Sequence, residues 1–168
     1  IETVECWEAA LTETKSPTTM VLSRQNLKAV RTETAGENLS AKGGYVLRNT
    51  DGGARDVTIL ATGSEVEIAV AAAEKLNGEG VKAAVVSLPC WELFAKQPKS
   101  YRDEVLGSAP RIAVEAASPF GWTRFVDEEE DVVGMFGFGA SAPGADLYKH
   151  FGITAEAVAE KAKSRIAR

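Results

Sequence analysis

The stretch DVTILATGSEVEIAVAAAEKL, residues 56–76, decides the fold class of this sequence. Its opening residues, DVTILAT, form a short apolar and β-branched run, which is typical of a buried strand. Gly63 predicts a turn, and the residues after it are apolar at helical spacing until Asn77-Gly78, where a helix is expected to end. The apolar positions of that helix are Val66, Ala69, Val70, Ala73 and Leu76. A strand followed at once by a helix is the repeating unit of an α/β fold.

The turn between this strand and helix, residues 61–64, allows two interpretations. Ser64 and Glu67 have the S-x-x-E spacing of a capping box, in which the serine simply caps the helix. Alternatively, the free N–H groups at the start of the helix can bind an anion. The capping interpretation is the simpler one, and we prefer it.

The same alternation continues along the rest of the chain. Strands are expected at 81–88, 111–116 and 131–136, and helices at 91–106 (interrupted at Pro98), 122–126 and 146–151. A last helix is expected from Ala155, with Thr154 as its cap. Alternating strands and helices imply a mostly parallel sheet that helices cover on both faces.

The N-terminal segment is organised differently. Residues 3–11 predict a helix, and 18–23 is a β-branched run that predicts a strand. One face of the helix carries Val4, Trp7 and Leu11. This unit is too small to bury a core of its own, and the polar stretch that follows it has no sustained period. Because the chain starts without a methionine inside an expected helix, we expect a fragment or a processed product.

Composition argues against several classes of protein. The 168 residues have a formal net charge of −5 and no basic stripe, which argues against binding nucleic acid. Apolar residues make up 45% of the chain and charged residues 26%, the balance of a soluble globular domain. One histidine and two distant cysteines, Cys6 and Cys90, cannot build a zinc site, and we expect both cysteines to be reduced thiols. No run of about 18 apolar residues is present to span a membrane.

Two charged residues stand where α/β proteins bind ligands. Arg24 follows the expected strand at 18–23, where a guanidinium can hold a phosphate or carboxylate through two parallel hydrogen bonds. Glu115 lies near the carboxyl end of the strand at 111–116, where a carboxylate can act as a general base. From the local sequence alone, a surface arginine and a glutamate held by structural hydrogen bonds are the preferred interpretations.

A glycine-rich turn at 137–142, GFGASA, fits the dinucleotide fingerprint G-x-G-x-x-A. A nucleotide-binding unit needs a second strand after its helix. The residues that remain are expected to be helical, so we prefer a simple tight turn. The acidic run at 127–131 is interpreted as a solvated turn, and His150 as a solvated helix residue. The residues alone reveal no catalytic or metal-binding constellation.

Several segments together resemble the bacterial transketolases, in the order in which that family has them and over essentially the whole chain. They are ECWEAAL, LSRQNL, KGGYVL, ILATGSEVEIAVAAAEKL, LPCWELFAKQPKSYRDEVL, RIAVEA, VVGMFGFGASAP and the final helix. Each is weak alone, but LSRQNL, ATGSEVE and the G-x-SAP turn are specific as a set.

The resemblance implies the biochemistry of a parent protein. Transketolases transfer a two-carbon ketol unit between sugar phosphates in the pentose phosphate pathway, with thiamine diphosphate and a divalent metal, Mg²⁺ or Ca²⁺. Their subunit has three α/β domains, and two cytoplasmic subunits form a homodimer whose active sites are built by the first two domains. We therefore expect this chain to be a non-catalytic piece that helps the dimer to form and is inactive alone.

The resemblance also implies a division of the chain. Residues 1–27 are similar to the end of the second, pyrimidine-binding domain, residues 28–42 to a linker and residues 43–168 to the C-terminal domain. That domain is a three-layer α/β/α structure with a mixed five-stranded sheet. The sheet is mostly parallel and its first strand is antiparallel, and we assign residues 44–48 to that strand.

One residue has a counterpart in the family's active site. Arg24, in SRQNL, resembles the arginine that binds the phosphate of the sugar substrate, so its role would be binding and positioning rather than proton transfer. The family's metal-binding motif, the glutamate that activates the cofactor and the substrate histidines have no counterparts. We therefore expect no catalytic, cofactor-binding or metal-binding residue in this chain.

Several alternatives stay open. The aromatic residues in turn-rich regions are either interface anchors or ordinary core: Trp91, Phe94, Phe120 and Trp122. A regulatory nucleotide-binding module that uses the 137–142 turn is one competing function, and an independent small enzyme that uses Glu115 is another. The equivalent domain of a deoxyxylulose-phosphate synthase or a 2-oxo-acid dehydrogenase is a third, and the SRQNL segment argues against it.

Overall fold

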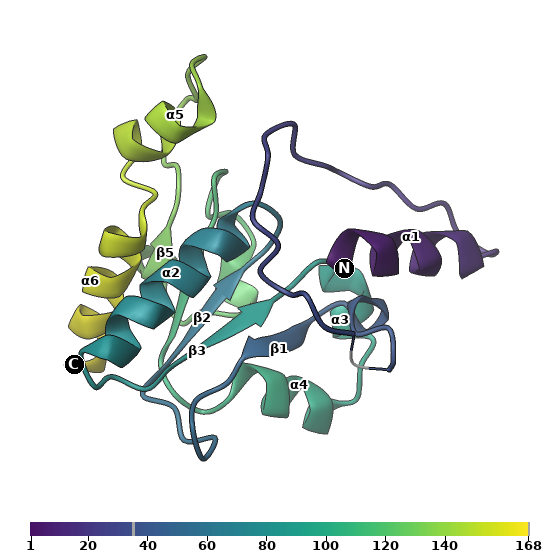
Figure 1. Ribbon diagram of the computed structural model, residues 1–168, viewed down its shortest axis with the longest axis horizontal. Helices are drawn as coiled ribbons and strands as arrows, with labels where there is room; N and C mark the ends of the chain where they lie inside the picture. The colour runs from purple at the N-terminus through teal and green to yellow at the C-terminus, as the bar shows by residue number, and fades with distance from the viewer. Residues whose placement is uncertain (35, 168) are drawn as a thin grey trace.

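The structure is a computed structural model that describes residues 1–34 and 36–167 (Figure 1). Ala35, in the expected linker, and Arg168, at the end of the expected last domain, lie outside the described residues. No helix in the described ranges is both long and apolar enough to cross a membrane.

The centre of the molecule is a five-stranded sheet with the strand order β1-β3-β2-β4-β5. The strands are β1 Tyr45–Arg48, β2 Val57–Ala61, β3 Ala83–Ser87, β4 Arg111–Val114 and β5 Val132–Val133. β1 runs antiparallel to β3, and every other neighbouring pair is parallel. The expected mixed sheet with an antiparallel first strand is therefore confirmed.

Alternating residues of the inner strands build two cores, one on each face of the sheet. In β2, Ile59 packs into one core and Leu60 into the other, and Val85 and Val86 of β3 divide in the same way. All four are fully buried, and each such side chain contributes roughly 1.5–3 kcal/mol of hydrophobic stabilisation. Burial on both faces explains why these strands are mostly apolar and show no alternation of apolar and polar residues.

Helices cover both faces and complete three layers. One core lies under α2 Glu65–Gly78 and α6 Ala155–Ile166, which pack side by side (Figure 1). The other core receives side chains from α3 Trp91–Ala95, α4 Lys99–Leu106 and the 3₁₀ turn η2 Trp122–Arg124. The remaining elements are α1 Glu2–Thr12, η1 Ser40–Lys42, η3 Glu129–Asp131 and α5 Gly144–His150. The three-layer α/β/α architecture is therefore confirmed.

The expected N-terminal helix is present as α1, but its polar side holds it to the domain. The Glu2 carboxylate accepts hydrogen bonds from the hydroxyls of Tyr45, at 2.7 Å, and Ser87, at 2.6 Å, on neighbouring strands. The apolar face that carries Val4, Trp7 and Leu11 stays exposed. Figure 1 shows α1 on the side of the molecule where β1 and α3 lie, away from α5 and α6.

The strand expected at 18–23 is wrong. These residues form neither strand nor helix and pair with no strand, and the side chain of Val21 is 92% exposed. A β-branched run predicts only a local preference for extended backbone, and a strand also needs a neighbour that offers hydrogen bonds.

The capping box at the start of α2 is also wrong. The Ser64 hydroxyl donates a hydrogen bond to the Glu65 carboxylate at 2.7 Å and makes no cap to the helix backbone. Glu67 instead accepts a hydrogen bond from the backbone N–H of Lys28 and pairs with its ammonium group. The expected cap of α6 is confirmed, because the Thr154 hydroxyl accepts a hydrogen bond from the backbone N–H of Ala157.

The acidic run at 127–131 is only partly a solvated turn. Asp131 is 2% exposed, and its carboxylate accepts hydrogen bonds from Arg165 at 3.2 Å and from the backbone N–H of Glu128 at 3.3 Å. The run forms the turn η3, so the strand expected at 131–136 shrinks to β5. A charge run shows no sign of which member will find a buried partner.

The four aromatic residues divide between core and surface. Phe94 and Trp122 are fully buried, and Trp91 is half-buried against Trp122. Phe120 is 90% exposed and is the only one of the four that is free to act as an interface anchor. Cys6 and Cys90 are free thiols.

Candidate functional site

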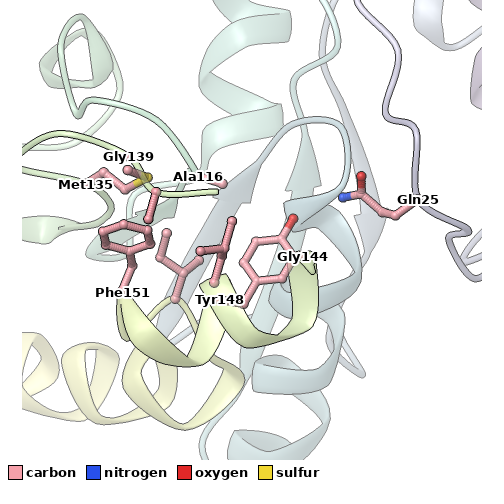
Figure 2. Close-up of a pocket in the computed structure, with 10 residues that line it drawn as sticks. Gln25, Ala116, Met135, Gly139, Gly144, Tyr148 and Phe151 are labelled. Carbon is pink, nitrogen blue, oxygen red and sulfur yellow. The ribbon is translucent and has the colours of Figure 1, made fainter. Parts of the chain in front are cut away.

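The carboxyl edge of the parallel strands holds a pocket of about 310 Å³, and its lining includes sequence neighbours of two candidates and part of the glycine-rich turn (Figure 2). Gln25, next to Arg24, lines the pocket from the N-terminal segment. Ala116, next to Glu115, lines it from the end of β4, and Gly139 lines it from the glycine-rich turn. Tyr148 and Phe151 close it from α5 and the residue after it. This is the edge at which open α/β sheets bind ligands.

Arg24 lies exposed in the extended N-terminal segment, and its guanidinium makes no hydrogen bond or ion pair with any other described residue. Two residues that follow Arg24, Gln25 and Lys28, contact the helices of the domain. Gln25 reaches toward Tyr148 in Figure 2, and Lys28 is bound to Glu67 of α2. Gln25, the next residue, lines the pocket at the carboxyl edge, and all five donors of the Arg24 side chain are unpaired in the described structure.

Glu115 lies half-buried just beyond β4, and its backbone N–H donates to the carbonyl of Val133 at 3.0 Å. Burial, and then the neighbouring Glu65 carboxylate, raise the pKa of Glu115 to about 7 against opposing hydrogen bonds from Trp122 and the Ala116 backbone. The interpretation of Glu115 as a glutamate held by structural hydrogen bonds stays a prediction, and the residue is half-buried. Its carboxyl group also titrates near neutral pH, as a general acid or base must.

Glu65 connects three elements at the same edge. The residue is buried in the first turn of α2 and accepts hydrogen bonds from the hydroxyls of Ser64 at 2.7 Å and Tyr148 at 2.5 Å. Burial and the hydrogen bond to Glu65 raise the pKa of Tyr148 to about 12. Tyr148 therefore keeps its proton at neutral pH and serves as a donor that fixes α5 against α2.

The anion-binding interpretation of the 61–64 turn is not supported. Glu65 and Glu67 stand in the first turn of α2, where they already occupy the positive end of the helix dipole with negative charge. A second anion at this terminus would meet two carboxylates.

The glycine-rich turn at 137–142 does not have the geometry of a nucleotide fingerprint. All six residues are exposed, and α5 starts only at Gly144, beyond the motif. In the described part of the chain, no strand follows α5. Gly139 contributes to the wall of the pocket, and His150 lies exposed at the end of α5 with its ring 4.8 Å from that of Phe151.

Sequence reasoning missed the residues that organise this edge. Gln25, Glu65 and Tyr148 were not singled out, because Glu65 and Tyr148 lie 83 positions apart and no local pattern joins them. Within residues 1–34 and 36–167, no group of three or more His, Cys, Asp or Glu side chains is placed to hold a metal ion. The described residues therefore do not fit a metal site.

The comparisons with known proteins agree with one another. A family model described as the transketolase-like C-terminal domain matches residues 43–154. Transketolase of Cereibacter sphaeroides is 58% identical over 99% of this chain, and chloroplastic transketolase of Solanum tuberosum is 46% identical over 96% of it. The solved structure of transketolase from Leishmania mexicana superimposes with a TM-score of 0.88 over 99% of this chain, at 40% identity.

In each comparison this chain spans about a quarter of the relative. It covers 25% of the Cereibacter protein, 22% of the Solanum protein and 24% of the Leishmania chain. The resemblance noted in the sequence is thus confirmed over nearly every residue, and the chain belongs to the transketolase family, corresponding to a portion that includes the C-terminal domain.

Proposed function

We propose that this chain is the C-terminal part of a transketolase that transfers a two-carbon ketol unit between sugar phosphates. The observation that carries the proposal is the 58% identity to a transketolase over 99% of this chain. The parent would act in the cytoplasm, in the pentose phosphate pathway, as a homodimer. The direct test is whether this chain restores ketol transfer to a transketolase from which the corresponding C-terminal part has been removed.

In this proposal the chain has three parts. Residues 1–27 belong to the preceding, pyrimidine-binding domain, residues 28–42 are the linker, and residues 43–168 are the C-terminal domain. The start of the family match at residue 43 supports the second boundary. The exposed apolar face of α1 supports the first, because Val4, Trp7 and Leu11 have no cover among the described residues.

The chain itself would not perform the chemistry. The described residues do not fit a divalent metal, so thiamine diphosphate and Mg²⁺ or Ca²⁺ would be held by the rest of the parent. The role left to this chain is to support the assembly of the dimer and to contribute to substrate binding. Phe120, 90% exposed, is available as an interface anchor.

Arg24 would bind the phosphate of the sugar substrate. Its guanidinium has no partner among the described residues, and Gln25 and Lys28, which both follow it in the sequence, hold its segment against α5 and α2. A free guanidinium on an anchored segment can bind a phosphate bidentately at little entropic cost. Its contribution would be to position the sugar, not to move a proton.

A further inference from the structure

A second cavity, of about 290 Å³, lies on the face of the sheet opposite α2 and α6, between α3, α4 and η2. We refer to it as the basic cavity. It shares no lining residue with the pocket at the carboxyl edge. Its walls combine the rings of Trp91 and Phe125 with the cationic side chains of Lys99, Arg102 and Arg124.

The aromatic wall of the basic cavity is fixed in place. The ring of Trp91 packs edge-to-face on Trp122, with centroids 4.9 Å apart, and on Phe125, with centroids 5.1 Å apart. Gly121 lies under the Trp91 ring with φ +88°, and a Cβ at this position would stand 3.1 Å from the ring. The indole therefore presents an apolar surface that needs no rearrangement to receive a ligand.

The cations of the basic cavity are only partly neutralised. Lys99 pairs with Asp103, which is the one carboxylate of the lining. The side chains of Arg102 and Arg124 make no ion pair with any residue of the described ranges. The Nε atom of Arg102 is buried, and it too lacks a hydrogen-bond partner in the described structure. The terminal nitrogens of the two arginines also have no partner among the described residues and are not buried, so they offer donors to a bound anion.

We propose that the basic cavity binds a small ligand consisting of one aromatic ring that carries a carboxylate or phosphate group. The ring would pack on Trp91 and Phe125, and the anionic group would accept hydrogen bonds from Arg102 and Arg124. Guanidinium groups suit this task because their planar donors match the geometry of a carboxylate or phosphate.

The size of the cavity limits the ligand to a single ring. Its volume lies at the lower end of the range of about 300–1,000 Å³ that is typical of small-molecule pockets, so a dinucleotide would not fit. The local excess of positive charge, in a chain whose formal net charge is −5, favours an anion here over other parts of the surface.

The experiment titrates the 168-residue chain with phenyl phosphate and, separately, with benzoate, and follows the three tryptophan indole N–H signals by NMR. The two probes distinguish a phosphate ligand from a carboxylate ligand. At least one should shift the Trp91 signal saturably, with a dissociation constant of about 1 mM or below, as expected for about ten non-hydrogen atoms. The Trp7 signal, from outside the cavity, should not move.

Two variants and one control locate the binding site. Arg124→Gln, at an exposed position, and Arg102→Gln should each weaken binding about tenfold or more. Lys96→Gln removes the same charge from an exposed residue of the same region that does not line the cavity, and it should leave binding unchanged. An unchanged NMR spectrum of the ligand-free Arg124→Gln variant shows that its fold is intact.

Three outcomes would overturn the proposal. The first is that neither probe shifts the Trp91 signal. The second is that the folded Arg124→Gln variant binds the probe as tightly as the unsubstituted chain. The third is that inorganic phosphate binds as tightly as phenyl phosphate, because the aromatic wall would then contribute nothing.

Discussion

The carboxylate of Glu5, in α1, lies 2.5 Å from the guanidinium of Arg31, and both side chains are only 10% exposed. The same carboxylate accepts hydrogen bonds from the backbone N–H and the hydroxyl of Ser40, and the guanidinium lies 4.8 Å from the centre of the Tyr45 ring. This network ties α1, which precedes the residues matched by the family model, to the C-terminal domain. The attachment is polar and leaves the apolar face of α1 free.

Removing the Glu5 carboxylate should loosen the attachment of α1. Glu5→Ala leaves the buried Arg31 guanidinium unpaired, so we expect the free energy of unfolding to fall by about 2–4 kcal/mol and amide exchange in α1 to accelerate. Urea unfolding and hydrogen exchange measure the two effects. The control is Glu33→Ala, which removes an exposed glutamate two residues after Arg31 that has no partner among the described residues. It should change neither the free energy of unfolding nor the exchange rate in α1. Unchanged exchange in α1 of the Glu5 variant would contradict the account.

Glu115 should make the chain less stable as the pH rises from about 5 to 8. Its pKa is raised from 4.5 to about 7, so the folded state keeps its proton over a range in which the unfolded state has lost it. The contribution of protonated Glu115 to the free energy of unfolding is complete below pH 4.5 and is lost as the pH rises past 7. Glu115→Gln, which cannot ionise, should match the unsubstituted chain at pH 5 and exceed its unfolding free energy by about 1–2 kcal/mol at pH 8, a value reduced for partial exposure.

The pH profile of Glu115→Gln is measured by urea unfolding at several pH values. Glu74→Gln, at an exposed glutamate of α2, removes the same charge without burial and should follow the unsubstituted chain at every pH. A stability difference for Glu115→Gln that stays constant from pH 5 to 8 would show that this carboxyl group does not titrate in that range.

Gly43 should be irreplaceable for steric reasons. It has φ +78°, and a Cβ would lie 2.2 Å from the backbone nitrogen of Phe94 and 2.3 Å from the carbonyl oxygen of Cys90. Gly43→Ala should therefore cost about 2–4 kcal/mol or prevent folding. Gly53 has a similar φ but lies in open space, so Gly53→Ala should lower the free energy of unfolding by about 1 kcal/mol. Gly137 has neither constraint, so Gly137→Ala should lower it by less than about 0.5 kcal/mol. Equal thermal stabilities for the three variants would refute this order.

Arg24→Gln, in the full-length parent, should raise the KM for a phosphorylated sugar about 10–100-fold. The reason is the loss of a charge-assisted, bidentate contact with the phosphate. The KM for an unphosphorylated sugar of the same length should not change. Lys15→Gln, which removes a charge from another exposed position of the segment, should leave both values unchanged. Equal effects of Arg24→Gln on the two sugars would exclude a phosphate-binding role.

The sheet could be predicted from sequence because its inner strands are buried on both faces. The stretches around Val57, Val85 and Ile112 are largely apolar and β-branched, and the structure places a strand in each of them. The antiparallel direction of β1 came only from the family resemblance, since Tyr45–Arg48 has no local pattern that encodes direction. The strand predicted at 18–23 failed because local preference cannot show whether a partner strand exists.

The candidate site could be predicted only in pieces. Arg24, Glu115 and the 137–142 turn were found one by one from their places at strand ends and turns. The pocket lined by Gln25, Ala116 and Gly139 depends on contacts such as the one between Glu65 and Tyr148, which join distant segments. Asp131 shows the same limit, because only the folded chain brings Arg165 within reach of it.

We propose that this chain completes a transketolase but does not catalyse ketol transfer alone. The decisive measurement is ketol transfer between sugar phosphates in the presence of thiamine diphosphate and Mg²⁺. Three samples are compared: this chain alone, a transketolase that lacks the part corresponding to this chain, and the two mixed. The Cereibacter protein, whose corresponding part is 58% identical to this chain, can supply the second sample, the remainder. We expect no turnover by this chain alone and a gain of activity on mixing. Turnover by this chain alone, or a mixture no more active than the remainder, would contradict it.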